Sequence, residues 1–164
     1  IINKVAESGL LTIDLEELHV PGERVLFDIR SWLYEELILR EKDFREQLKE
    51  LDWSGFSGKH VAVTCTADAV IPVWAYMLIA ASLAPYARTT VFGTLERLEE
   101  ELFMQQLNGL DLSIYKDQRV IIKGCSNVPV PVSVYVRLTS LLQPIVKSVM
   151  YGEPCSTVPV YKRK

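Results

Sequence analysis

Apolar residues dominate the stretch 59–93 and predict a strand, a helix and a second strand. Residues 61–66 are rich in Val, Ala and Thr and show no polar alternation, which is typical of a strand buried on both faces. The helix that follows begins near Pro72, because proline suits the first helical turn, and positions 69–87 contain no charged residue. We therefore expect a βαβ unit whose helix lies in the interior or at an interface.

A second copy of this pattern follows 59 residues later in the chain. The matches run without a gap from the proline that opens each helix to the glycine that ends each second strand, and such a repeat has to be found before the fold is assigned. Cys65 and Cys125 match when one residue is inserted in the second copy. The pairs that carry the repeat are Asp52 and Asp111, Val61 and Val120, Pro72 and Pro131, Tyr76 and Tyr135, Pro85 and Pro144, and Gly93 and Gly152.

Two consecutive βαβ units favour an α/β fold with a mostly parallel sheet and helices on its faces. We expect one domain over residues 1–164, whose two halves join through their first strands, as in doubly wound sheets. Ligands in such sheets bind beyond the carboxyl ends of the central strands, which here carry Cys65 and Cys125. The expected parts are an N-terminal addition (1–51), the first repeat (52–93), a connecting helix (94–110), the second repeat (111–152) and a C-terminal tail (153–164).

Composition narrows the class of protein. The formal net charge is −3, so the chain lacks the basic surface that nucleic-acid binding requires. Hydrophobic residues make up 49% of the chain, from which we expect a homodimer. The uncharged segment 69–87 approaches the length of a membrane span, but its two prolines, its small residues Ala80, Ala81 and Ser82, and its soluble counterpart at 131–145 argue against spanning. We expect a cytoplasmic protein with no membrane partner.

The three cysteines form the candidate site. Each is followed by a hydroxyl residue and a Val/Pro stretch, most clearly in Cys125-Ser-Asn-Val-Pro-Val and Cys155-Ser-Thr-Val-Pro-Val. If Cys65, Cys125 and Cys155 meet at one edge of the sheet, three thiolates could bind zinc, iron or an iron–sulfur cluster. Asp68 and Glu96 are the candidates for a fourth ligand, since Asp68 lies in the first cysteine loop and Glu96 is the repeat counterpart of Cys155.

Three other interpretations of the cysteines stay open. Cysteine is among the most frequently buried residues, and duplication alone would copy one buried cysteine into the other repeat. A redox or nucleophilic thiol acting on a small molecule is a second possibility, although no histidine adjoins any cysteine in the sequence. The third is a non-catalytic homo-oligomeric interaction module whose apolar helices pair subunits. The sequence by itself names no reaction.

Four segments of the chain resemble an uncharacterised bacterial family of the Bacteroidetes type, domain of unknown function 2480. They are GERVLFDIRSWL, LREKDFREQL, TCTADAVIPVWAYML and the terminal YGEPCSTVPVYKRK, and the resemblance covers essentially the whole chain. It implies a cytoplasmic protein with no established activity, so it assigns no catalytic residue. It also implies a link to iron–sulfur assembly proteins, which favours the metal or cluster hypothesis.

Overall fold

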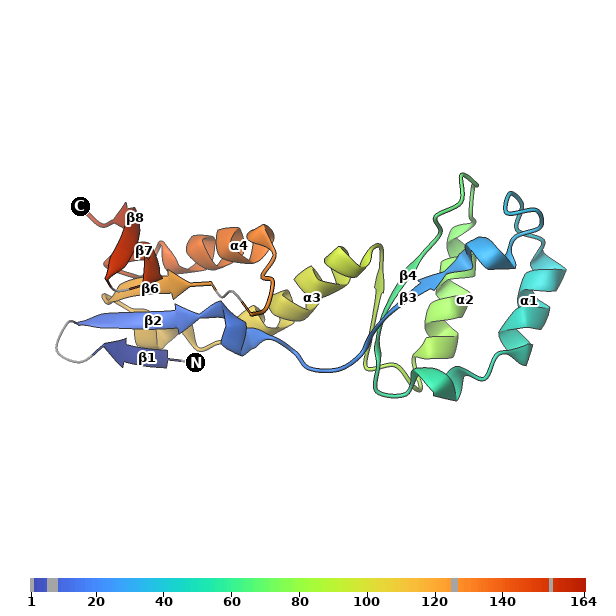
Figure 1. The fold of residues 1–164 in the computed structure, drawn as a ribbon, viewed down its shortest axis with the longest axis horizontal. Coiled ribbons are helices and arrows are strands. Elements are labelled where there is room, and N and C mark those ends of the chain that lie inside the picture. Colours follow the sequence, from blue (N-terminus) through green and yellow to red (C-terminus); the bar gives the residue numbers. More distant parts are fainter. Residues whose placement is uncertain (1, 6–8, 125–126, 154) are drawn as a thin grey trace. The chain divides into compact units, whose positions relative to one another are not determined.

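The computed structural model describes residues 2–5, 9–124, 127–153 and 155–164, which group into two units (Figure 1). Unit 1 consists of Ile1–Val20 and Glu99–Lys164, and unit 2 consists of Pro21–Leu98. Unit 2 is therefore inserted, in sequence, into unit 1. Each unit has its own sheet and its own hydrophobic core, and the predicted α/β class with parallel strands is confirmed.

Unit 2 is a three-stranded parallel sheet with its helices packed on one face. The sheet has the strand order β3-β4-β5. Because each strand is added on the same side of the previous one, right-handed crossovers place both helices on one face, where α1 and α2 lie side by side (Figure 1). The elements are β3 (Arg24–Asp28), η2 (Ile29–Trp32), α1 (Glu41–Glu50), η3 (Trp53–Phe56), β4 (His60–Thr64), α2 (Val73–Leu83) and β5 (Thr89–Phe92).

Aromatic residues fill the core of unit 2. Phe27 of β3 stacks on Trp53 with the ring centroids 5.5 Å apart, and the edge of Trp32 meets Phe27 at 5.3 Å. The indole nitrogen of Trp53 donates a hydrogen bond to the Leu48 carbonyl at 2.9 Å, so its one polar atom is satisfied. These contacts attach α1 and the loop after it to the same face of the sheet that α2 covers.

Unit 1 repeats this arrangement and adds a strand at each edge of the sheet. Its strand order is β1-β2-β6-β7-β8, in which β2, β6 and β7 are parallel while β1 and β8 are antiparallel to their neighbours. The elements are β1 (Ile2–Val5), β2 (Leu10–Asp14), η1 (Leu15–Leu18), α3 (Leu95–Asn108), whose residues up to Leu98 fall in unit 2, η4 (Leu112–Tyr115), β6 (Arg119–Lys123), α4 (Val132–Leu142), β7 (Ser148–Glu153) and β8 (Ser156–Lys162).

The duplication predicted from the sequence is confirmed element by element. The 3₁₀ turn, the first strand and the helix of each repeat have the same lengths and start 59 residues apart, as η3 and η4, β4 and β6, and α2 and α4 show. Both 3₁₀ turns are capped in the same way: Asp52 accepts a hydrogen bond from the Ser54 amide at 3.1 Å, and Asp111 accepts one from the Ser113 amide at 3.0 Å.

The predicted pairing of the two halves is wrong. The first strands of the repeats, β4 and β6, do not pair with each other but belong to different sheets. A strand buried on both faces needs a neighbour at each edge, and β3 supplies it to β4 while β2 supplies it to β6. The segment 1–51, which the repeat pattern leaves outside the duplication, thus gives β1 and β2 to unit 1 and β3 to unit 2. The number of domains stays a prediction.

The C-terminal segment, expected as a tail over residues 153–164, contains a strand, β8. Strand β8 pairs with β7 along its length, with a register shift between Val149 and Met150 that accommodates Pro159. Tyr161 packs against the core of unit 1. The Arg163 guanidinium donates a hydrogen bond of 2.6 Å to the Asp117 carboxylate, which fixes the chain end to the loop before β6.

Candidate functional site

The structure places two of the three cysteines in different units. Cys65 follows β4 of unit 2 and is partly buried against its core. Cys155 is exposed in the turn between β7 and β8 of unit 1. Cys125 lies outside the described residues. Cys65 and Cys155 therefore do not share a sheet edge, because the strands they follow belong to separate sheets.

The proposed fourth ligands are both exposed. Asp68 lies in a bend of the loop after β4, and Glu96 lies in the first turn of α3. Within the described ranges, no three His, Cys, Asp or Glu side chains come together as metal ligands would. The metal or iron–sulfur hypothesis thus stays a prediction. Metal analysis of the purified protein tests it, with the variant that has serine at all three cysteine positions as the control.

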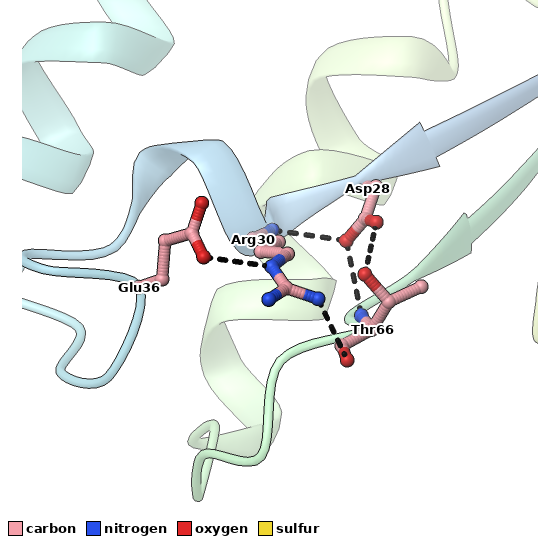
Figure 2. A network of polar contacts seen from close by, with 4 residues as sticks. All are labelled: Asp28, Arg30, Glu36 and Thr66. Carbon is pink, nitrogen blue, oxygen red and sulfur yellow. Dashed lines mark hydrogen bonds and ion pairs between the residues drawn. The ribbon is translucent and has the colours of Figure 1, made fainter.

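The carboxyl ends of β3 and β4 carry a polar network that the sequence did not reveal (Figure 2). Asp28 ends β3, and one of its carboxylate oxygens accepts hydrogen bonds from the Arg30 amide at 3.0 Å and the Thr66 amide at 3.1 Å. Its other oxygen accepts a bond from the Thr66 hydroxyl at 2.5 Å. Partial burial raises the pKa of Asp28, but these hydrogen bonds and the Arg30 charge outweigh it and hold that pKa below the ordinary value.

Arg30 extends the network to a hairpin beyond η2. Its Nε atom donates to Glu36 at 3.0 Å, and its Nη1 atom reaches the Thr66 carbonyl at 3.4 Å (Figure 2). Glu35 and Glu36 both have positive φ, 52° and 57°, which glycine or asparagine adopts more readily. The ion pair from Arg30 to Glu36 thus helps to hold an uncommon backbone conformation.

This network positions the loop that contains Cys65 rather than supplying a free acid or base. The Asp28 oxygens are occupied by three hydrogen bonds from neighbouring residues. Burial, with the nearby Cys65 and Asp28 groups, raises the pKa of Tyr76, so its phenol stays neutral at physiological pH. His60 is also structural, since its ring is buried and its two nitrogens lie 2.9 Å from the Thr89 hydroxyl and 3.0 Å from the Pro21 carbonyl.

An apolar cavity of about 470 Å³ lies between α2 and the edge strand β5. Its walls are almost entirely hydrocarbon and aromatic, and several of the residues are exposed, with Val73 at 74%, Met77 at 64% and Phe92 at 66%. The ring of Tyr76 meets the ring of Phe92 edge-on, with the centroids 5.0 Å apart. The lining residues are Val63, Val73, Tyr76, Met77, Ala80, Thr90, Val91 and Phe92. We call this surface the α2/β5 groove.

Comparison with known proteins identifies the family. The family described as "Protein of unknown function (DUF2480)" matches residues 1–163. The chain belongs to the DUF2480 family. No curated protein and no solved structure matches it significantly. The resemblance drawn from the sequence is therefore confirmed, and because the family carries no assigned activity, function has to be argued from the geometry of the DUF2480 chain itself. Among its described helices, none is long and apolar enough to cross a membrane.

Unit 1 of the DUF2480 chain shows what can occupy such a groove. There the strand equivalent to β5 is β7, and β8 of the same chain pairs with it in antiparallel fashion. Tyr161 of β8 lies opposite Val149 and packs against the core. The repeat makes Thr90, a residue of the α2/β5 groove, the counterpart of Val149. The part of the groove at Thr90 thus corresponds to the place where Tyr161 packs in unit 1.

Apolar exposure alone would not have singled out this site. On α4, Val132 and Val136 are 76% and 61% exposed, closely matching their counterparts Val73 and Met77 on α2. The distinguishing feature is the sheet edge, which β8 occupies in unit 1 and which β5 itself forms in unit 2. The one signal available in the sequence was the absence of charge between positions 69 and 87.

Proposed function

We propose that this protein is a non-catalytic interaction module, in which unit 2 accepts an extended strand from a partner at the edge of β5. The observation that carries the proposal is the internal comparison: the same repeat has an antiparallel strand, β8, on the equivalent strand β7 of unit 1. Proteins commonly recognise extended segments by such strand addition, in which the backbone supplies affinity and side-chain pockets supply specificity.

The edge itself favours this function. An edge strand presents a row of backbone N–H and C=O groups that can pair with another chain, and natural proteins usually protect such edges with charges, prolines or bulges. Strand β5 reads Thr-Thr-Val-Phe and has none of these charges or prolines. Unit 1 protects both edges of its parallel strands with β1 and β8, and unit 2 has no equivalent of either among its described strands.

The groove supplies the apolar surface that strand addition needs. Burying one side chain of the size of Val, Met or Phe from water contributes about 1.5–3 kcal/mol. Phe92 is 66% exposed, whereas its counterpart Tyr151, which β8 pairs opposite Val158, is 46% exposed, so an added strand would remove part of the apolar surface at this edge from water. The Asp28 carboxylate accepts a hydrogen bond from the Arg30 amide, and the Arg30 guanidinium donates one to the Thr66 carbonyl. Neither of these two side chains lines the groove. The surface thus fits a partner chain better than a polar substrate.

A peptide with the sequence of the protein's own edge strand tests the proposal. The synthetic peptide STVPVYK, residues 156–162, is titrated into the full chain at low protein concentration, and hydrogen exchange of the backbone amides is followed by NMR. We expect amides of β5 to gain protection. Met77→Glu should abolish the gain, whereas Val136→Glu, at the equivalent and equally exposed position of α4, should leave it intact.

Two results would contradict strand addition at β5. One is a peptide that leaves every β5 amide unprotected at millimolar concentration. The other is protection of β5 that persists unchanged in Met77→Glu, because the groove would then play no part. Circular dichroism of both glutamate variants shows whether each keeps the fold.

A further inference from the structure

Resting on the proposed strand addition, we infer that the partner at the β5 edge is β5 of a second copy of this chain, paired antiparallel, so that Phe92 of each copy enters the α2/β5 groove of the other.

The symmetry of such a pair restricts its register. Two identical strands pair antiparallel about a twofold axis perpendicular to the sheet, and this operation keeps each side chain on its own face. Side chains alternate along a strand, so only residues separated by an even number of positions can lie opposite each other. Thr90 and Phe92 satisfy this condition, and both line the groove on the helix face. The pairing Thr90 with Phe92, and Val91 with itself at the axis, is therefore allowed.

The register of β8 on β7 selects this pairing from the allowed ones. In unit 1 an aromatic residue, Tyr161, lies opposite Val149, which is the counterpart of Thr90. The second copy reproduces this contact only if its own aromatic residue in β5, Phe92, lies opposite Thr90. Phe92 is 66% exposed although it is a large apolar side chain at a sheet edge. In the paired arrangement its ring would pack on α2 of the other copy.

Charge favours a second copy over a different partner. A surface that pairs with itself brings identical groups together, and like charges across an interface are destabilising. The chain has a net charge of −3, yet positions 69–87, which include all of α2, contain no charged residue. By contrast α4, whose neighbouring edge is already occupied by β8, contains Arg137. A partner of opposite charge would have no complementary charge on α2 to recognise.

Cysteine cross-linking in the full chain tests the register. In a background with serine at positions 65, 125 and 155, single Val91→Cys should form a disulfide-linked dimer rapidly under mild oxidation, because the two copies of position 91 face each other. Thr90→Cys alone and Phe92→Cys alone should cross-link at least about tenfold more slowly. A mixture of these last two variants should cross-link readily to each other.

Sedimentation equilibrium supplies the second measurement. The wild-type chain should sediment at twice its mass of 18.6 kDa, and Phe92→Glu should raise the dimer dissociation constant by about 30-fold or more, as expected for a central aromatic contact. Val136→Glu is the matched control and should remain a dimer. A wild-type chain that stays monomeric, a dimer that Val136→Glu disrupts equally, or a dimer without the Val91→Cys cross-link would each overturn the inference. If the peptide of residues 156–162 still protects β5 in those cases, strand addition stands and only the second copy is excluded.

Discussion

Replacing Gly124 by alanine tests how the second repeat packs at the end of β6. Gly124 has no positive φ, so its backbone does not require glycine. A methyl group there would instead lie 1.6 Å from the Tyr135 hydroxyl oxygen and 2.8 Å from its Cζ atom. No such separation is tolerable between non-bonded atoms, so the tyrosine ring has to leave its place. The counterpart in unit 2 is Cys65, which carries a Cβ.

The cost follows from what Tyr135 loses when it moves. Its partly buried ring packs against the core of unit 1 and meets Tyr151 with the centroids 5.9 Å apart. Overpacking typically costs 1–3 kcal/mol, and an aromatic pair contributes about 0.5–1.5 kcal/mol, so we expect Gly124→Ala to lower the free energy of unfolding by about 2–3 kcal/mol. In urea, with a slope of about 2 kcal/mol per molar, the midpoint should fall by about 1 M.

A double-mutant cycle shows whether the tyrosine is the cause. In a Tyr135→Leu background the ring is absent, so Gly124→Ala should then cost less than about 0.5 kcal/mol. Cys65→Ala is the matched control in unit 2 and should change stability little, because it retains a Cβ at the equivalent place. If Gly124→Ala costs the full amount in both backgrounds, the strain lies in the backbone and the packing argument is refuted.

Three further changes have expected outcomes. Asp28→Asn weakens the hydrogen bonds from Thr66 and should lower the free energy of unfolding by about 1 kcal/mol in urea at pH 7, since the site is partly exposed. The folded-state pKa of Asp28 is lowered, so the stability that its carboxylate contributes is present above the ordinary pKa of 3.8. This stability should vanish as pH falls through the lowered pKa. Tyr161→Ala should cost about 1–2 kcal/mol and speed hydrogen exchange in β8 before β6, because it removes packing on the core of unit 1. Glu35→Gly relieves a positive φ and should raise the thermal midpoint, corresponding to about 0.5–1 kcal/mol.

The sequence predicted the local structure of the repeats well. Each helix begins directly after its proline, α2 after Pro72 and α4 after Pro131. The offset of 59 residues holds through every element, so no residue is inserted before Cys125, and Gly124 takes the place after β6 that Cys65 takes after β4. These features depend on contacts close in sequence, where proline geometry and apolar periodicity dominate.

Strand pairing could not be predicted in the same way. A strand buried on both faces requires a neighbouring strand at each edge, but its sequence does not identify those neighbours. Any parallel apolar strand meets the requirement. The available signal was the repeat of an apolar segment ending in aspartate, at Asp14 and at Asp28, each of which caps a 3₁₀ turn. These aspartates are 14 residues apart, too close to appear as a βαβ repeat. Once the two aspartates are recognised as strand ends, β2 is assigned to unit 1 and β3 to unit 2.

The candidate site depended on that pairing. Whether β5 lies at an edge or in the middle of a sheet is decided by partners distant in sequence, so the α2/β5 groove could not be located from the pattern alone. The Asp28 network likewise joins residues 38 positions apart, through the loop after β4. The uncharged helix did indicate an interface, but it did not identify the strand beside it.

The sequences of α2 and α4 differ in charge, and the sheet edges beside them differ as well, because β8 pairs with β7 whereas β5 is an edge strand. Helix α4 carries the exposed Arg137 where α2 carries Leu78, which packs against the core of unit 2, and α4 lies beside a strand that β8 already pairs. A helix next to a completed edge has no partner to receive, so polar substitutions there cost little. The exposed apolar positions beside the edge are similar in the two repeats, since Val132 and Val136 of α4 match Val73 and Met77 of α2, so the difference lies in the edge itself. An open apolar edge promotes aggregation unless it is covered, and a strand from another chain at β5 would complete unit 2 as β8 completes unit 1.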